Sequence, residues 1–338
     1  MEYPEKCKAA VIHSYNDNLL RAILAMKVEE VDLPVPGPDE LVIRVDASPV
    51  NPSDIAFLRG GYNIRKSLPA IPGFEGTGIV VHAGGNAADQ KGRRVSFFTQ
   101  EERNGAWSEY TVTSADNCIL TDDHMPLDQA ACFSVNPFTA FGLMEIALET
   151  GAGLIVQNAG GGQVAGFIRC LAEENGMKVI NVVRKNDTAK ELREAGFEVL
   201  VSSEDNFPET LAEKAGGRKT LVLDAVGGEM TGIMLNALPD GSRVVVYGAL
   251  EGGMVGHIDP MGVIFMDKMV SGFNLNKWRA DRTQKELDRI SGKLQTIIIS
   301  GHCKTGIAGT YDLENMVQGI RDYIRNMSAG KILIRPSA

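Results

Sequence analysis

Several features are scarce or missing in this sequence of 338 residues, and each absence narrows the class of protein. The five cysteines are scattered without a Cys-x-x-Cys pair, which argues against a disulfide framework and a cysteine-rich zinc site. The net charge of −9 argues against a nucleic-acid or anionic-membrane partner. No apolar run approaches the roughly 20 residues of a membrane-spanning helix, and no secretory signal is recognisable. We therefore expect a reduced, cytoplasmic protein.

The pattern of apolar residues divides the chain into two kinds of structure. Residues 1–124 hold short β-type runs between Gly, Pro and Asn turns, which predicts a β-rich domain. Residues 125–275 alternate apolar runs with helical segments, which predicts a parallel sheet covered on both faces, as in a doubly wound dinucleotide-binding fold. Residues 276–338 hold two amphipathic helices and a short strand, too little for a third domain, so we expect them to return to the first. The six predicted parallel strands lie at 154–157, 178–183, 199–201, 221–224, 244–247 and 269–273.

A glycine-rich segment follows the first of these strands. Gly160, Gly162 and Ala165 fit the pattern Gly-x-Gly-x-x-[Gly/Ala] between a strand and a helix, which is the context that a dinucleotide site requires. The two glycines permit a tight turn and close approach to a pyrophosphate, and the helix N-terminus offers free N–H groups to that anion. A purely structural glycine turn is the alternative.

The second predicted strand ends in a basic pair, Arg184 and Lys185. An NAD site places an acid there for the ribose 2′-hydroxyl, whereas an arginine suits the 2′-phosphate of NADP. The sequence therefore favours NADPH over NADH, with a solvated basic turn as the alternative.

Short motifs along the whole chain resemble the zinc-free branches of the medium-chain dehydrogenase/reductase superfamily, the quinone oxidoreductases and the 2-enoyl thioester reductases. The resemblance implies a GroES-like catalytic domain plus a Rossmann domain, an active site in the cleft between them, and homodimers built near residues 269–275. The segments that favour the mitochondrial-type enoyl reductases are 157–159, 180–184 and 272–278, although Asn274 replaces a tryptophan of that group. The motifs that carry the wider resemblance lie at 50–55, 71–78, 105–110, 136–140 and 330–334.

The resemblance also implies roles for particular residues. Tyr62 matches a proton donor of the enoyl thioester reductases and a pocket wall of the quinone reductases, and both roles stay open. Asn51 and Asp54 would lie at the substrate, with a turn-capping role as the alternative for Asp54. Trp278 would line the substrate pocket or cover core. A helix N-cap role for Asn136 and a plain surface position for Lys331 are the alternatives to a cofactor role. The residues that the resemblance and the strand order assign to the cofactor are Asn136, Thr139, Tyr247, Gly248, Phe273, Asn274 and Lys331.

Zinc-dependent relatives carry Cys and His ligands at positions where this chain has other residues. The matching stretches read Asn51-Pro52-Ser53-Asp54, Gly73-Phe74-Glu75 and Ser134-Val135-Asn136, so we expect no bound metal. Reduction of a conjugated carbonyl needs no zinc, because the enolate that forms can be stabilised and protonated by side chains.

Three functions follow in order of preference. The first is an NADPH-dependent reductase of conjugated carbonyl compounds, either small enals and enones or 2-enoyl thioesters of coenzyme A or a carrier protein. The second is an NADPH:quinone oxidoreductase. The third is a catalytically idle NADPH-binding protein, which the unusual Gln163 and Ala165 of the glycine turn support. A carrier-protein partner would need a basic rim, with a solvated face as the alternative. The candidate local clusters are Arg59 with Arg65 and Lys66, and Lys277 with Arg279 and Arg282.

Overall fold

The computed structural model describes residues 3–102 and 104–337, which form two compact units. Unit 1 consists of the described residues of Met1–Asn136 and Asp288–Ala338, and unit 2 is Pro137–Leu287. The boundaries predicted at 124/125 and 275/276 both lie earlier in the chain than these divisions.

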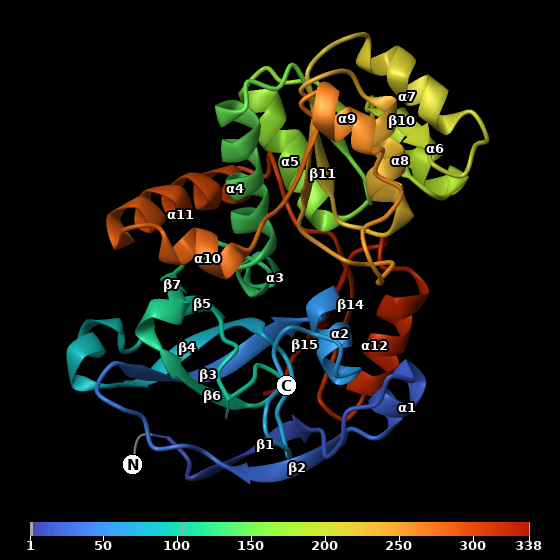
Figure 1. Ribbon diagram of the computed structural model, residues 1–338. Coiled ribbons are helices and arrows are strands. Elements are labelled where there is room, and N and C mark those ends of the chain that lie inside the picture. Colours follow the sequence, from blue (N-terminus) through green and yellow to red (C-terminus); the bar gives the residue numbers. More distant parts are fainter. Residues whose placement is uncertain (1–2, 103, 338) are drawn as a thin grey trace. The chain divides into compact units, whose positions relative to one another are not determined.

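Unit 1 is β-rich, with a long sheet in the order β14-β15-β3-β4-β5-β7, in which β6 pairs with β3, and a separate β1–β2 hairpin (Figure 1). The pairing is antiparallel except between β14 and β15, and β15 joins the C-terminal strands to β3. Its strands are β1 (Lys6–Val11), β2 (Lys27–Asp32), β3 (Glu40–Pro49), β4 (Glu75–Ala83), β5 (Arg94–Phe98), β6 (Tyr110–Ser114), β7 (Cys118–Leu120), β14 (Ile307–Tyr311) and β15 (Lys331–Ile334).

Short helices cover this sheet, and α12 packs against β14 and β15. A cluster of buried apolar side chains, which includes Phe57, Phe74 and Trp107, joins α2 to the C-terminal elements. The helices are α1 (Leu19–Leu24), α2 (Pro52–Leu58), α3 (Leu127–Ala131), α11 (Gln284–Ile299), which begins in unit 2, and α12 (Met316–Arg325), with the 3₁₀ turns η1 (Gly85–Gln90) and η2 (Ala115–Asn117).

Unit 2 is a six-stranded sheet in the order β10-β9-β8-β11-β12-β13, and every pair in it is parallel. The chain starts in the middle of the sheet, proceeds to one edge and then returns to build the other half, as in a doubly wound fold. The strands are β8 (Leu154–Gln157), β9 (Val179–Val183), β10 (Glu198–Val201), β11 (Thr220–Asp224), β12 (Arg243–Val246) and β13 (Met269–Gly272).

Each strand of unit 2 is a short apolar run because both faces of the sheet are covered by helices. Val156, Val222 and Val244 are fully buried and belong to one core with Leu211 of α7 and Leu235 of α8. All six predicted parallel strands are present, and the predicted fold class is confirmed. The helices are α4 (Asn136–Glu149), α5 (Gln163–Glu174), α6 (Asn186–Glu194), α7 (Phe207–Ala215), α8 (Glu229–Ala237), α9 (Pro260–Phe265) and α10 (Leu275–Ala280).

Candidate functional site

Tyr62 lies in unit 1, in the loop that follows α2, and it is half-buried. Its ring stacks on Phe74 with a centroid distance of 5.5 Å and an interplanar angle of 27°. Its hydroxyl oxygen accepts a hydrogen bond from Gln100 Nε2 at 3.3 Å. Phe74 is held in turn by Phe57, whose ring meets it edge-on at 5.1 Å. The phenol therefore sits on a rigid aromatic stack with a defined polar neighbour.

Asp54 lies in the first turn of α2 and is fully buried. Its carboxylate accepts hydrogen bonds from the backbone N–H of Asn51 at 2.8 Å and of Phe74 at 3.1 Å. The carboxylate thus caps α2, which was the alternative role for this residue, and it also fixes the segment that carries Phe74. Burial raises the pKa of Asp54 to about 7, although the two N–H donors and the Lys331 ammonium act in the opposite direction.

Lys331 is buried rather than a surface lysine. Its ammonium donates to Asn51 Oδ1 and, at 3.3 Å, to the Val50 carbonyl. The Asn51 amide in turn donates to Glu75 Oε2 at 2.8 Å, and burial raises the pKa of the Glu75 carboxyl. Lys331, Asn51, Glu75 and Asp54 form a connected group that we call the buried charge cluster, with the cation on β15 and the carboxyl groups on β4 and α2.

Lys66 is also buried, so the expectation that it belongs to a basic surface cluster is wrong. Its ammonium donates to the carbonyls of Asn104 and Ile71 and lies 5.6 Å from the centre of the Phe74 ring. Burial lowers its pKa to about 8, against the opposing effect of nearby carboxylates, of which Glu102 contributes most. Lys66 therefore ties two loops together beneath the Tyr62–Phe74 stack instead of offering charge to a partner.

The glycine turn of unit 2 connects β8 to α5. A Cβ atom on Gly160 would lie 2.8 Å from the Cβ of Asn181, and one on Gly162 would lie 3.1 Å from the Ala159 carbonyl oxygen. Ala159 itself has a positive φ of 48°, which is uncommon outside glycine. Gly162 is the N-cap of α5, so this turn leaves the first N–H groups of a 12-residue helix without helical partners.

Ala165 is buried behind this turn, and its carbonyl accepts a hydrogen bond from Gln157 Nε2 at 3.1 Å. Arg169 of α5 reaches back, with Nη1 2.6 Å from the Gly160 carbonyl oxygen and 2.9 Å from Asn181 Oδ1. Ala165 therefore supplies the small residue that the pattern requires at its third position. The bond from Arg169 to the Gly160 carbonyl fixes the turn.

A second polar group joins β8 to β11, the two strands between which the order of the sheet reverses. Asn158 Nδ2 donates to the Asp224 carboxylate, and Asn158 Oδ1 accepts from the Ala225 N–H at 2.7 Å. The backbone N–H of Tyr247 donates to the Asp224 carbonyl at 2.8 Å. A Cβ on Gly248 would lie 2.6 Å from the Ala225 carbonyl oxygen. These loops lie at the carboxyl ends of the strands, where doubly wound sheets bind their ligands.

Arg184 and Lys185 follow β9 directly and are exposed, with Lys185 as the N-cap of α6. The Arg184 carbonyl accepts a hydrogen bond from Ser203 Oγ at 3.2 Å, which ties the ends of β9 and β10 together. Both side chains therefore leave the sheet at the edge that the glycine turn occupies.

Trp278 is buried in unit 2, on α10. Its ring meets Phe273 at a centroid distance of 6.3 Å, and its Nε1 donates to Glu145 at 2.9 Å. A Cβ on Gly142 would lie 2.7 Å from Phe273 and 2.8 Å from Trp278. Trp278 thus packs between α10 and α4, and Asn274 caps α10 by accepting from the Lys277 N–H at 2.9 Å. Asn136 and Thr139, both buried, open α4.

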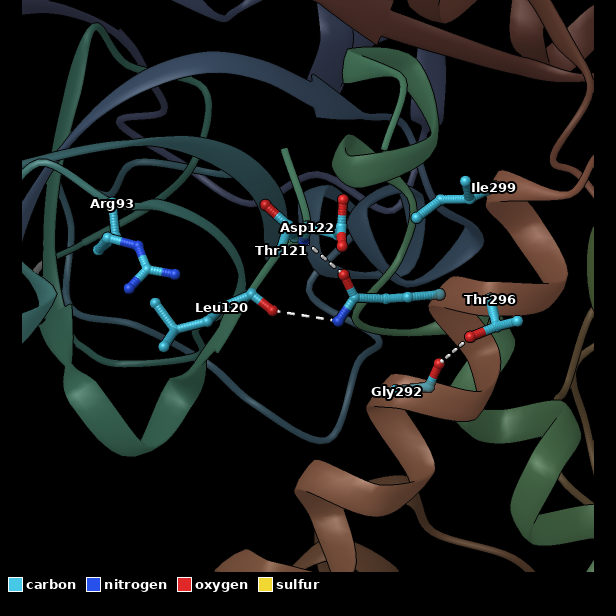
Figure 2. Close-up of a pocket in the computed structure, with 8 residues that line it drawn as sticks. Arg93, Leu120, Thr121, Asp122, Gly292, Thr296 and Ile299 are labelled. Atoms are coloured by element: carbon cyan, nitrogen blue, oxygen red, sulfur yellow. Dashed lines mark hydrogen bonds between the residues drawn. The ribbon is translucent and has the colours of Figure 1, made fainter. Parts of the chain in front are cut away.

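A shallow surface cavity of about 350 Å³ lies in unit 1 between β7 and α11 (Figure 2). Arg93, Asp122 and Ile299 line it, and Figure 2 marks the bond from Thr296 Oγ1 to the Gly292 carbonyl on α11. None of the residues predicted for binding or catalysis lines this cavity.

Metal-ligand clusters and membrane-spanning helices are both missing from residues 3–102 and 104–337. No group of three or more His, Cys, Asp or Glu side chains there is arranged to hold a metal ion. In the same ranges no helix is long and apolar enough to span a membrane. Cys132 lies beside Glu75, and burial and that carboxyl raise the pKa of its thiol well above the ordinary value. The described residues therefore do not fit a zinc ion.

Two family models match the chain. The model described as "Alcohol dehydrogenase GroES-like domain" matches residues 37–123, and the one described as "Zinc-binding dehydrogenase" matches 166–292. A GroES-like β-rich unit together with a doubly wound parallel sheet defines a two-domain dehydrogenase or reductase. The chain belongs to the medium-chain dehydrogenase/reductase superfamily.

Relatives and solved structures narrow the relationship. The mitochondrial enoyl-[acyl-carrier-protein] reductase of Xenopus tropicalis is 29% identical over 273 residues, which cover 78% of this chain and 77% of the relative. The Mus musculus protein of the same name is 26% identical over 339 residues, covering 98% and 89%. The structure of a putative NADPH:quinone reductase from Mesorhizobium loti has a TM-score of 0.92 and 29% identity, and the match covers 99% of this chain and 100% of that one. The chain is therefore a reductase-type member related to both groups.

Several residues of these sites were not singled out from the sequence. Gln100, Asp224 and Arg169 are polar residues at the ends of apolar strands or on a helix face, where the local pattern gives them no distinct signal. Glu75 did carry a distinct signal in the sequence, because a carboxylate between glycines in an otherwise apolar strand is buried only when it has partners.

Proposed function

We propose that this protein is an NADPH-dependent reductase of conjugated carbonyl compounds, with 2-enoyl thioesters as the preferred substrates. The observation that carries the proposal is the half-buried Tyr62, whose hydroxyl oxygen accepts from Gln100 and whose ring is fixed on Phe74. The names of the enoyl-[acyl-carrier-protein] reductases to which the chain is related support this substrate class. A coenzyme A or carrier-protein handle on the thioester is part of the proposal.

Tyr62 is the proposed proton donor. A nicotinamide dinucleotide bound to unit 2 would supply a hydride for the β-carbon of the substrate. The enolate that results needs a proton at its α-carbon, and a phenol remains protonated at neutral pH and can donate one. Burial raises the pKa of Tyr62, so this residue holds its proton throughout the physiological range. Asn51 and Asp54 act indirectly in this proposal, because their polar atoms bind other protein groups.

The glycine turn of unit 2 is proposed to bind the cofactor pyrophosphate. A side chain at Gly160 would lie too close to Asn181, so the tight turn requires glycine there, and the N-terminus of α5 would attract an anion through its helix dipole. The loops after β11 and β12, with Tyr247 and Gly248, supply the remainder of the proposed crevice. The other residues that we assign to the cofactor from the family resemblance are Asn136, Thr139, Phe273, Asn274 and Lys331.

Arg184 and Lys185 are proposed to bind the 2′-phosphate of NADPH. We expect Arg184→Asp to weaken NADPH binding by about tenfold to a hundredfold, because a charge-assisted bond is lost and a repulsive charge is added. Binding of NADH should remain the same or improve. Titration of both cofactors by fluorescence measures this. Arg289→Asp makes the same charge change at an exposed position of α11 and should leave both affinities unchanged. Equal losses for NADPH and NADH would contradict the assignment.

A second function, NADPH:quinone reduction, is favoured by one specific observation. The Mesorhizobium loti structure, described as a putative NADPH:quinone reductase, matches this chain over nearly its full length. In that reaction Tyr62 would line the pocket rather than donate a proton. The proposed function is tested by following NADPH oxidation with crotonyl-CoA and a simple quinone side by side. Faster turnover of crotonyl-CoA supports the first proposal, and faster turnover of the quinone supports the second. NADPH binding without turnover of either substrate would favour the catalytically idle protein.

We further propose that the protein forms homodimers through β13 and α9. β13 is the last strand of the parallel sheet, and apolar side chains on and around α9 are exposed, among them Ile264 at 65% and Phe265 at 72%. Exposed apolar surface next to an open strand edge is typical of an interface between subunits.

The double substitution Ile264→Glu and Phe265→Glu is expected to raise the dimer dissociation constant by about 500-fold or more, because each of the two side chains would contribute about 2 kcal/mol in the core of an interface. Sedimentation velocity across a concentration series measures this. Val35→Glu changes an even more exposed apolar residue in unit 1 and should leave the association state unchanged. A wild-type protein that is monomeric at all concentrations would contradict the proposal.

A further inference from the structure

The direction of the hydrogen bond between Gln100 and Tyr62 determines whether the Tyr62 hydroxyl keeps its own proton for donation. Gln100 Nε2 is the donor and the phenol oxygen is the acceptor, at 3.3 Å. Within residues 3–102 and 104–337 this is the one hydrogen bond of the Tyr62 hydroxyl. A phenol has one donor hydrogen besides its acceptor sites. The arrangement therefore leaves the O–H proton of Tyr62 available for a group outside the described protein.

The groups around Tyr62 determine how easily its phenol oxygen can carry a negative charge. Burial raises the pKa of the phenol, and the carboxyl group of Asp54 on α2 acts in the same direction, whereas the Gln100 hydrogen bond lowers it. The nearby cation, Lys66, lies over the Phe74 ring on which Tyr62 stacks. Gln100 is thus the neighbour that would stabilise negative charge on the phenol oxygen by a direct contact.

Hydrogen bonds of the two residues that flank Gln100 fix its position. The N–H of the preceding Thr99 donates to the Phe74 carbonyl at 2.8 Å. The following Glu101 accepts from the Ser114 N–H at 3.2 Å and from Asn117 Nδ2 at 2.8 Å. Phe74 therefore anchors the ring of Tyr62 and the strand end that carries Gln100, so the phenol and the amide share one support.

We propose that Gln100 is a positioning residue for proton donation by Tyr62: it orients the phenol and then stabilises the phenolate. This inference rests on the proposed function, in which a bound nicotinamide cofactor would supply the hydride for the β-carbon. The O–H bond of Tyr62 breaks, and its proton forms a C–H bond at the α-carbon of the enolate. The electron pair of the O–H bond stays on the phenol oxygen, where the Gln100 N–H binds it. Solvent returns a proton to Tyr62 afterwards.

Kinetics of two Gln100 variants test the direction of the bond. We expect Gln100→Leu to lower kcat with crotonyl-CoA about tenfold, with KM changed less than twofold, because the contact acts on the proton transfer. Gln100→Glu keeps the size of the side chain, but an ionised carboxylate only accepts and would turn the phenol proton toward itself. Its kcat should be lower still at pH 8 and should recover only as the pH falls toward about 4.5, where the carboxyl becomes protonated and can donate. A role in packing alone predicts that Gln100→Glu is the milder variant at every pH.

A second measurement does not depend on turnover. Tyrosine is replaced biosynthetically by a ring-fluorinated analogue, and ¹⁹F NMR follows the titration of each phenol. The resonance of Tyr62 is identified by its absence in Tyr62→Phe. In Gln100→Leu we expect this resonance to titrate roughly half to one pH unit higher than in the wild-type protein, since a hydrogen bond to the phenolate is lost. Gln318→Leu, which removes a side chain bonded to Asp322 on α12, should not move it.

The outcomes separate this inference from the proposed function. A Tyr62 titration that is unchanged or shifted downward in Gln100→Leu overturns the role of Gln100. Loss of kcat in Tyr62→Phe with full kcat in Gln100→Leu overturns that role as well, while the acid role of Tyr62 stands. Full kcat in Tyr62→Phe overturns the acid role instead, and with it the catalytic meaning of the Gln100 contact.

Discussion

Replacement of Tyr62 by phenylalanine is expected to lower kcat for a 2-enoyl thioester by about 100-fold or more, because general acid catalysis contributes that much in enzymes. The variant keeps the ring that stacks on Phe74, so binding of substrate and cofactor should be retained and KM should change little. Stopped-flow measurement of NADPH oxidation in a single turnover isolates the chemical step from product release.

Tyr311→Phe is the matched control. Tyr311 is another tyrosine of unit 1, and its hydroxyl donates to Asp322 at 2.8 Å. This variant should keep the single-turnover rate within twofold of the wild-type value. A Tyr62→Phe variant that oxidises NADPH as fast as the wild-type protein would show that the phenol lines the pocket, as in the quinone reductase alternative.

The substitution Lys331→Met is expected to lower the free energy of unfolding of unit 1 by about 3–5 kcal/mol, because removal of one partner leaves buried charge uncompensated. Lys331 is the cation of the buried charge cluster, and Asp54 and Glu75 are its carboxyl groups. Methionine has a similar size, so the change removes charge and hydrogen bonds more than volume. Lys304→Met, at an exposed position, should cost less than about 0.5 kcal/mol.

The effect of Lys331→Met should depend on pH. The pKa of Asp54 in the folded protein is about 7, which is raised above its unfolded value. Below pH 7 this carboxyl is protonated and needs no cation, whereas above pH 7 it is charged. The loss of stability should therefore be larger at pH 8 than at pH 6.

Urea unfolding followed by tryptophan fluorescence measures the difference. Trp107 is buried in unit 1 and Trp278 in unit 2, so a Trp278→Phe background reports unit 1 alone. A loss below 1 kcal/mol, or an equal loss at both pH values, would contradict the charge-balancing role.

Local sequence patterns were sufficient to predict unit 2. Parallel strands covered on both faces appear as short apolar runs, and a nucleotide-binding turn needs glycines at fixed spacing, so both features are visible in adjacent residues. Gly160, Gly162 and Arg184 lie at the carboxyl ends of the strands that the runs predict.

The polar contacts of unit 1 could not be predicted in the same way. The Asn51–Lys331 bond joins residues 280 positions apart, and Gln100 contacts Tyr62 only because two loops meet at Phe74. Lys66 was expected at the surface because lysine is rarely fully buried without partners. Its partners are backbone carbonyls of distant loops, which the sequence does not reveal. Trp278 bonds to Glu145, which lies 133 positions earlier, so its packing could not be predicted from adjacent residues either.

The central claim, hydride addition to a conjugated carbonyl with a separate proton donor, is tested most directly with isotopes. NADPH that carries deuterium at the transferable position is allowed to react with crotonyl-CoA in ordinary water, and the butyryl-CoA product is analysed by NMR. We expect deuterium at the β-carbon and a proton from solvent at the α-carbon. Deuterium at any other position, or oxidation of NADPH without a reduced thioester, would contradict this claim.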